Sequence, residues 1–189
     1  MRHSPPSLLT NPTSSRPAPI LRVRSLTVTR HDQIIEPRSF IDTYERWWKL
    51  GGVFTLLDVE FAVLIMRMCS YASLFLPSPN YNLDTVRGMN LSNIRSICSD
   101  VGNTLFSIAI DMDRWGSVVR VQHLLLYALK FHCEGNPHEL WLALRHASQV
   151  AKELRFYERF DQVWFRDSDF DLDWEVGCRV MCVLYIWDK

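Results

Sequence analysis

Apolar residues recur at intervals of three and four along most of the chain from Ser39 onward, and this spacing limits what the chain can fold into. It gathers apolar side chains on one side of an α-helix, whereas a half-buried strand alternates apolar and polar residues. No series of short alternating segments bounded by turns competes with it. The sequence therefore predicts an all-α fold, an irregular bundle or stack of about six antiparallel helices. The expected helices cover residues 39–50, 55–74, 91–108, 118–129, 138–156 and 174–189.

Short polar or glycine-containing sequences mark the ends of several expected helices. Thr55 followed by Asp58 has the spacing of a capping box, and Ser117 is a second N-cap candidate. Gly51-Gly52 is expected to end the first helix, and Gly135-Asn136-Pro137 to form a turn.

Two of the expected helices differ in how completely they should be buried. The helix that starts at Thr55 is apolar nearly all round, which predicts a position deep in the core. The helix that begins near Leu91 or Ser92 is amphipathic, so only one face should pack inside. Between the last two helices, residues 157–173 are expected to form a loop or a broken helix. The predicted core face of the amphipathic helix consists of Leu91, Ile94, Ile97, Cys98, Val101, Leu105 and Ile108.

Residues 1–38 differ in composition from the rest of the chain. Six of the nine prolines precede Phe40, and residues 1–38 hold six arginines but only two acidic residues. Proline interrupts helices, and aromatic and aliphatic residues become dense only after Ser39. We therefore expect a disordered basic tail at 1–38 and one folded domain at 39–189. The whole chain is neutral, with 21 basic and 21 acidic residues, which argues against a nucleic-acid surface spread over its length.

Cysteine usage and hydropathy bear on the cellular compartment. Five cysteines, an odd number at wide spacing, indicate reduced thiols of a cytosolic or nuclear protein. No apolar run reaches the ~18 residues of a transmembrane helix, and no secretory signal is visible, so no membrane association is expected. Residues 1–31 lack acidic residues and resemble a mitochondrial presequence in composition, although their prolines interrupt an amphipathic helix. A mitochondrial helical scaffold for protein interactions stays an alternative.

Candidate metal ligands lack the spacing that metals require. The group His132, Cys133, His138 and His146 is close in sequence but has no tight ligand pair of the kind seen in tetrahedral zinc sites. Cys178 and Cys182 share a helix face at i and i+4, and we interpret them as core residues.

An acidic segment near the C-terminal helix also fails as a metal site. Asp167, Asp169 and Asp171 match the first ligand positions of a calcium loop. Leu172 and Cys178 stand where that loop requires glycine and glutamate, so it could neither turn tightly nor close around the ion. We predict no metal and no cofactor in this chain.

Catalytic motifs are absent from the sequence. It contains no nucleophile elbow and no glycine-rich phosphate loop, so we predict no catalytic residues and a chain that is not an enzyme. The alternative is a small helical enzyme with a site near His123, His132, Cys133 and His146. His123 lies within an apolar helix, which is more typical of a hydrogen-bonded core histidine than of a base.

Four motifs follow one another in the folded part. They are Phe40-Ile41-Asp42-Thr43-Tyr44; Ser117-x-x-x-Val121-Gln122-x-Leu124-Leu125-Leu126-x-Ala128; Trp141-x-x-Leu144-x-x-Ala147-x-x-x-Ala151-x-x-Leu154; and Glu175-x-x-x-Arg179 followed by Leu184-Tyr185-x-x-Asp188-Lys189. In this order they resemble the fungal-specific transcription factor domain, the middle homology region downstream of binuclear zinc clusters. The resemblance covers residues 39–189. Departures are Gly177-Cys178, Met181-Cys182 and Lys189, where the family often has arginine, Trp-Trp and arginine.

This resemblance implies a non-catalytic regulatory domain of a nuclear fungal transcription factor. Such a domain would modulate transcription through protein partners or a small-molecule effector, and its full-length parent could form a homodimer. DNA and zinc binding would belong to an N-terminal zinc cluster, whose cysteines are absent here. The helices that usually follow the last motif are also absent, so a C-terminally incomplete fragment of a larger regulator is expected.

Overall fold

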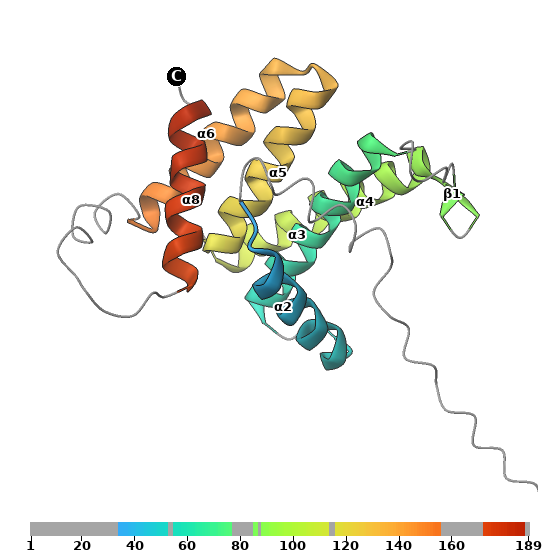
Figure 1. The fold of residues 1–189 in the computed structure, drawn as a ribbon, viewed down its shortest axis with the longest axis horizontal. Coiled ribbons are helices and arrows are strands. Elements are labelled where there is room, and N and C mark those ends of the chain that lie inside the picture. The colour runs from blue at the N-terminus through green and yellow to red at the C-terminus, as the bar shows by residue number, and fades with distance from the viewer. Residues whose placement is uncertain are drawn as a thin grey trace, which may run out of the picture.

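The computed structural model describes residues 34–52, 55–76, 85–86, 88–113, 116–155 and 172–187, and it confirms the all-α fold. In Figure 1, α3 and α4 lie side by side, α5 and α6 form an adjoining pair, and α8 lies along that pair. The helices of this part of the chain are α2 (Pro37–Leu50), α3 (Leu56–Ala72), α4 (Leu91–Met112), α5 (Val118–Glu134), α6 (Pro137–Glu153) and α8 (Leu172–Trp187).

Three short elements lie between α3 and α4 in the part of the chain that the structure describes. A 3-10 helix, η1 (Ser73–Phe75), continues α3 by one turn. The strands β1 (Thr85–Val86) and β2 (Met89–Asn90) form an antiparallel pair directly before α4. The sequence did not predict these strands, because such short segments cannot produce a visible alternation.

The helix ends follow the predicted capping residues. The Thr55 backbone N–H donates to Asp58 Oδ2 at 2.8 Å, and the Asp58 N–H donates back to Thr55 Oγ1 at 3.2 Å. This reciprocal pair is the predicted capping box at the start of α3. Ser117 caps α5 by accepting from the Arg120 N–H, and Gly51 and Gly135 end α2 and α5 in the left-handed conformation.

The first helix begins earlier than predicted. α2 starts at Pro37 rather than Ser39, because a proline fits the first helical position and Glu36 caps the helix through the Ser39 N–H. Ile34 and Ile35 are buried before it, and Gln122 Nε2 donates to the Ile34 carbonyl at 2.8 Å. Residues 1–33 of the expected tail lie outside the described residues, so its disorder stays a prediction.

α3 occupies the centre of the fold. Twelve of its 17 residues are buried, as the all-round apolar pattern predicted. It packs against both α4 and α5. The core around it includes Phe40 of α2, Leu125 of α5, Val150 of α6 and Val180 of α8, so all these helices share one hydrophobic cluster.

The predicted core face of α4 is wrong in part. Leu91 is buried, but Ile97, Val101 and Ile108 are exposed. The buried contact uses small residues instead, Gly102 and Ala109. A Cβ atom added to Gly102 would lie 3.4 Å from the Met66 Cβ, so α4 approaches α3 closely there, while Ile97, Val101 and Ile108 stay exposed.

The C-terminal region agrees with the sequence in outline. α8 begins at Leu172, slightly before the expected start at Trp174, and most of the expected loop at 157–173 lies outside the described residues. The side chain of Glu175 and the Asp188-Lys189 pair also lie outside them, so their pairings stay predictions. Among the described helices, none combines enough length with enough apolar character to span a bilayer.

Gly116 is expected to tolerate no side chain. Its φ is +81°, and an added Cβ would lie 2.8 Å from Val150 Cγ1 and 3.1 Å from Arg120 Cδ. Gly51 has a similar φ of +67° but open space around it, so Gly51→Ala is the matched control for backbone strain. We expect Gly116→Ala to lower the free energy of unfolding by about 1–3 kcal/mol more than Gly51→Ala. Urea denaturation of both variants measures this, and equal losses would contradict the packing argument.

Candidate functional site

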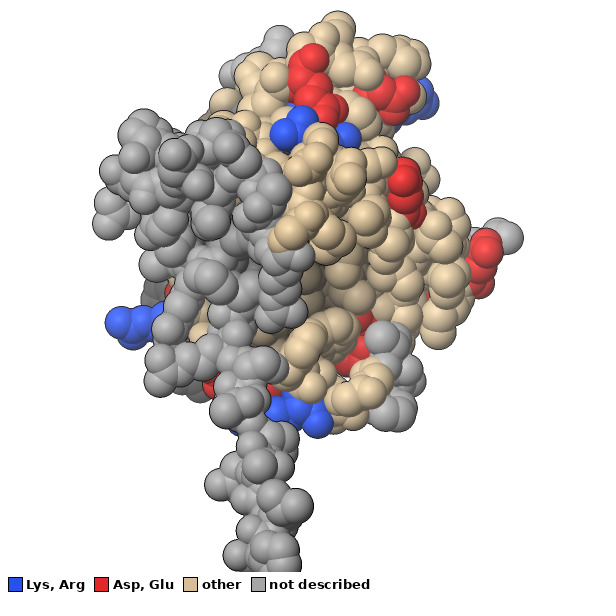
Figure 2. Space-filling view, turned by 90° about the vertical axis from the view of Figure 1, so that its right-hand side faces the viewer, with Lys and Arg blue, Asp and Glu red and all other residues tan. Residues whose placement is uncertain are grey.

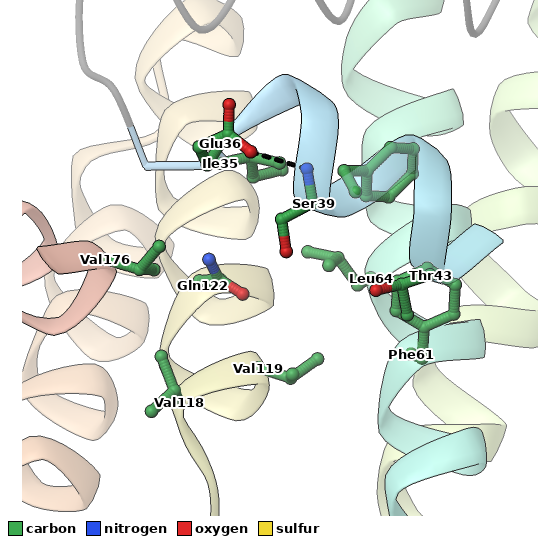
Figure 3. Close-up of a pocket in the computed structure, with 11 residues that line it drawn as sticks. Ile35, Glu36, Ser39, Thr43, Phe61, Leu64, Val118, Val119, Gln122 and Val176 are labelled. Carbon is green, nitrogen blue, oxygen red and sulfur yellow. Dashed lines mark hydrogen bonds between the residues drawn. The ribbon is translucent and has the colours of Figure 1, made fainter. Parts of the chain in front are cut away.

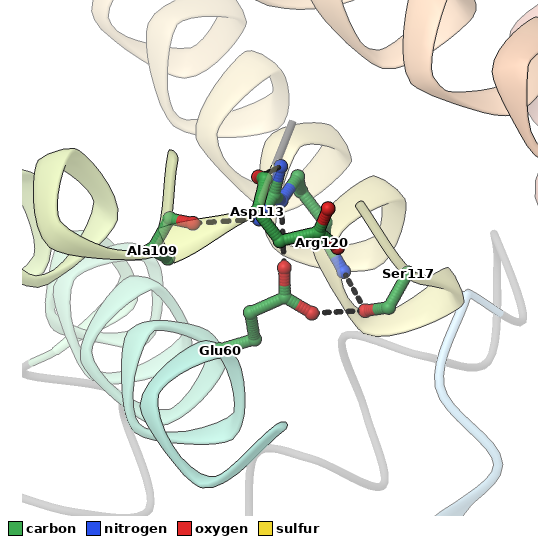
Figure 4. Close-up of polar contacts among 5 residues, drawn as sticks. All are labelled: Glu60, Ala109, Asp113, Ser117 and Arg120. Carbon is green, nitrogen blue, oxygen red and sulfur yellow. Dashed lines mark hydrogen bonds and ion pairs between the residues drawn. The ribbon is translucent and has the colours of Figure 1, made fainter. Parts of the chain in front are cut away.

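A buried ion pair joins Glu60 of α3 to Arg120 of α5. Arg120 Nε donates to Glu60 Oε1 at 2.6 Å, and the side chains of Arg120 and Glu60 are 2% and 0% exposed, respectively. The Ser117 hydroxyl donates to the other Glu60 oxygen (Figure 4). Both carboxylate oxygens are therefore occupied by groups from the start of α5.

The same guanidinium also reaches the end of α4. Arg120 Nη1 donates to the Asp113 carbonyl at 2.9 Å, and Nη2 donates to the Ala109 carbonyl at 3.1 Å. The Ala109 carbonyl also accepts the Asp113 N–H at 3.1 Å, and the carbonyls at the C-terminal end of a helix carry partial negative charge that attracts cations. Arg120 thus links α3, α4 and α5, and its donors are engaged in holding helices together.

A second buried arginine, Arg67 of α3, lies between α4 and α5. Its Nη2 donates to Asn103 Oδ1 at 2.6 Å, and its guanidinium carbon lies 3.5 Å from the centre of the Tyr127 ring. Burial lowers the pKa of Arg67, and Tyr127 partly opposes this shift. An amide oxygen and an aromatic face therefore stabilise this cation.

His123 of α5 is enclosed next to these arginines. It is fully buried, as expected of a core histidine, but the expected hydrogen bond is absent, because neither ring nitrogen has a partner among the described residues. The Phe106 ring packs edge-on against it, 5.0 Å away, and the His146 ring lies 5.5 Å from the same Phe106 ring. Burial is the main cause that holds the pKa of His123 well below 6.5, and the positive charges of Arg67 and Arg120 lower this pKa further.

The alternative enzyme site is not assembled. His132 and Cys133 are exposed near the C-terminal end of α5, about 14–15 Å along the helix from His123 at ~1.5 Å per residue. His146 is half-buried on α6, and Phe106 packs against both it and His123. Within the described parts of the chain, no three His, Cys, Asp or Glu residues form a metal-binding group.

The cysteines give one contact that the sequence did not predict. Cys69 of α3 and Cys98 of α4 lie side by side, and the hydrogen bond with Cys98, together with burial, raises the pKa of the Cys69 thiol. A single pair that joins two separate helices leaves no sequence signal. Cys182 is exposed rather than part of the core, and the side chain of Cys178 lies outside the described residues.

A small pocket opens between α2, α3, α5 and α8. Its volume is about 130 Å³. The Ser39 hydroxyl and the Gln122 amide oxygen point into it, and the Glu36 carboxylate lies at its upper edge (Figure 3). The remaining walls are mostly apolar: Ile35, Phe40, Thr43, Phe61, Leu64, Val118, Val119 and Val176. The sequence did not indicate this pocket, because its residues come from four separate segments.

Comparison with known proteins shows that the chain is homologous to one part of fungal transcription factors. It is 38% identical over 160 residues to Transcription factor xilB of Penicillium rubens, covering 83% of this chain and 24% of that protein. It is 37% identical over 153 residues to Probable transcription factor sol4 of Alternaria solani, covering 81% and 27%, respectively. The chain thus spans about a quarter of the length of these relatives. No protein-family model and no solved structure matches it.

Removing one member of the Glu60–Arg120 pair is expected to be strongly destabilising. Glu60→Leu should cost about 3–5 kcal/mol of unfolding free energy, because it leaves the Arg120 charge buried without its carboxylate. Glu60→Leu combined with Arg120→Met should recover part of that loss, which a double-mutant cycle measures. Glu134→Gln, which breaks the more exposed Lys130–Glu134 pair, is the control and should change stability by under ~1 kcal/mol. Equal small effects at Glu60 and Glu134 would contradict this view of the core.

His123 is expected to make the fold less stable in mild acid. Its pKa is lowered by folding, so below pH ~6.5 the unfolded chain takes up a proton that the folded chain does not. As the pH is lowered below ~6.5, the free energy of unfolding should decrease with a slope that approaches about 1.4 kcal/mol per pH unit from this residue. Above that pH, the contribution of His123 to the pH dependence vanishes. His123→Leu should reduce the slope between pH 6.5 and 5, as measured by urea denaturation. Leu125→Ala, a destabilised but non-titrating control, should keep the wild-type slope.

Proposed function

We propose that the chain is a non-catalytic regulatory segment of a nuclear fungal transcription factor, corresponding to the fungal-specific transcription factor domain. The observation that carries the proposal is the homology to Transcription factor xilB and Probable transcription factor sol4 over more than four fifths of the chain. Because this covers about a quarter of each relative, we assign DNA and zinc binding to another part of a longer parent protein.

The positions of the motif residues support a framework role. Ser117 caps α5, and Val121, Leu124 and Leu125 bury the same helix in the core. On α6, Ala147 and Ala151 are fully buried, and such small residues let α5 and α6 pack closely. These buried motif residues determine helix packing rather than present reactive groups.

The interior polar groups also favour a non-enzyme. The Glu60–Arg120 pair is closed off by its own hydrogen bonds, and His123 is sealed behind Phe106. A general acid or base must reach the proton that it transfers, within hydrogen-bond distance of a substrate. Burial of these groups supports a structural role, and regulation would then depend on the surface and the pocket.

The pocket supports a small-molecule effector as one route of regulation. Its volume of about 130 Å³ is close to that of an engineered cavity of ~150 Å³ that admits benzene. Oxygen acceptors from Glu36, Ser39 and Gln122 border it, so a ligand with a hydroxyl or ammonium donor and a short apolar body would fit. The Glu36 carboxylate would repel a carboxylate ligand.

A tethered reporter assay tests the proposed function. The full chain fused to an unrelated DNA-binding domain should enter the nucleus and change transcription of a reporter, in either direction, relative to that domain alone. Leu125→Asp, which disrupts the core, should abolish the change. Turnover in a broad hydrolase panel that is lost with His123→Ala or His146→Ala would instead support the enzyme alternative. Import of the chain into mitochondria would support the scaffold alternative.

A further inference from the structure

α4 leaves a continuous apolar stripe uncovered. Ile97, Val101, Ile108 and Met112 are 51%, 40%, 45% and 58% exposed. Their spacing of four, seven and four positions keeps them on one side of a helix about 33 Å long. Four large apolar side chains in a row on one helix are a feature of binding surfaces rather than of ordinary solvent-exposed faces.

The stripe is one half of a wider apolar arc. Gly102 and Ala109 form the half that packs on α3, and Ile94 and Leu105 are half-buried at the border. On a helical wheel the stripe continues directly from this border, so the apolar arc covers about half of the helix circumference. The arc is therefore wide enough for α3 and for one more helix.

The charged side chains that border the stripe are acidic and lie along one of its two edges. The charged residues of α4 are Arg95, Asp100 and Asp111. Arg95 donates to the hydroxyl and the carbonyl of Ser73, both at 3.1 Å, which leaves it on the covered side. Asp100 and Asp111 are exposed and follow the solvent edge of the stripe, beyond Thr104 on the helical wheel. Figure 2, seen from the side where α4 lies in Figure 1, shows broad uncharged areas with only scattered charged groups.

This charge pattern selects against a second copy of the same helix. In a parallel pair, the edge with Asp100 and Asp111 of each copy would face the opposite border of the stripe in the other copy, where Ile94 and Leu105 supply no positive charge. In an antiparallel pair that places Val101 opposite Ile108, Asp100 of one copy would approach Asp111 of the other. The antiparallel pair brings like charges together and the parallel pair gives the carboxylates no ion pair, whereas a partner with basic residues at that edge would gain ion pairs.

We propose that the α4 stripe binds an amphipathic helix of another protein, one with apolar residues at three- and four-residue spacing and Lys or Arg along the edge that faces Asp100 and Asp111. The mode is helix-to-helix packing, in which apolar anchors supply affinity and edge charges select the partner. The inference rests on the proposed function, because it names the partner class for a protein-contact surface. If the tethered reporter showed no change in transcription but a basic amphipathic peptide still bound the α4 stripe, the proposed function would be rejected and the proposed binding surface would stand.

Two designed helical peptides, each matched to α4 in length, test the proposal. Both carry the same leucine stripe, with lysines flanking it in one and glutamates in the other. We expect fluorescence anisotropy with the full chain to show about 2- to 30-fold tighter binding of the lysine peptide, a preference that weakens at high salt. Val101→Lys with Ile108→Lys should abolish binding of both peptides. Because both residues are exposed, circular dichroism should show an unchanged helical content.

Charge reversal supplies the matched control. Asp100→Lys with Asp111→Lys should invert the preference toward the glutamate peptide. Asp42→Lys with Glu45→Lys makes the same net change on α2, where Asp42 and Glu45 are exposed, and should preserve the lysine preference. Equal binding of the two peptides, or inversion by the α2 variant, would overturn the proposal. So would a concentration-dependent dimer in sedimentation velocity that Val101→Lys with Ile108→Lys removes, since a second copy would then occupy the stripe.

Discussion

The fold depends on the buried ion pair between Glu60 and Arg120. A charge removed from water is costly unless it is paired and fully hydrogen-bonded, and here both partners meet that condition. Arg120 donates hydrogen bonds to Glu60 and to two carbonyls at the end of α4, and the Ser117 hydroxyl donates to the second oxygen of the Glu60 carboxylate. One side chain therefore fixes the relative positions of α3, α4 and α5. The remaining helices, α2, α6 and α8, contribute to the hydrophobic cluster that includes α3 and α5.

This arrangement also supports the proposal that the protein acts through its surface. The interior contains two arginines and a histidine, but each is closed off by hydrogen bonds, aromatic rings or burial. Two surface features, in contrast, present groups that a ligand or partner could contact. The pocket beside Gln122 holds acceptor oxygens, and the stripe of α4 leaves large apolar groups in contact with water. Homology to parts of fungal transcription factors fits a framework that acts through contacts.

Sequence patterns predicted the local structure well because local structure depends on neighbouring residues. Thr55 and Asp58 formed the capping box, Ser117 capped α5, and α3 was as buried as its composition required. The candidate site was much less predictable. Glu60 and Arg120 lie far apart in the sequence, and Cys69 and Cys98 are joined only by the packing of α3 on α4. The pocket draws its walls from four segments, so no single motif marks it.

The sequence by itself determined the helical class, most helix boundaries and which helix lies at the centre, since apolar periodicity and capping residues act within one or two turns. Tertiary structure decided which half of the apolar arc of α4 is covered. The small residues Gly102 and Ala109 allow the closest approach to α3, so that half is buried and Val101 and Ile108 face outward. A helical pattern shows how wide an apolar face is, but the shape of the neighbouring helix determines which part of it becomes core.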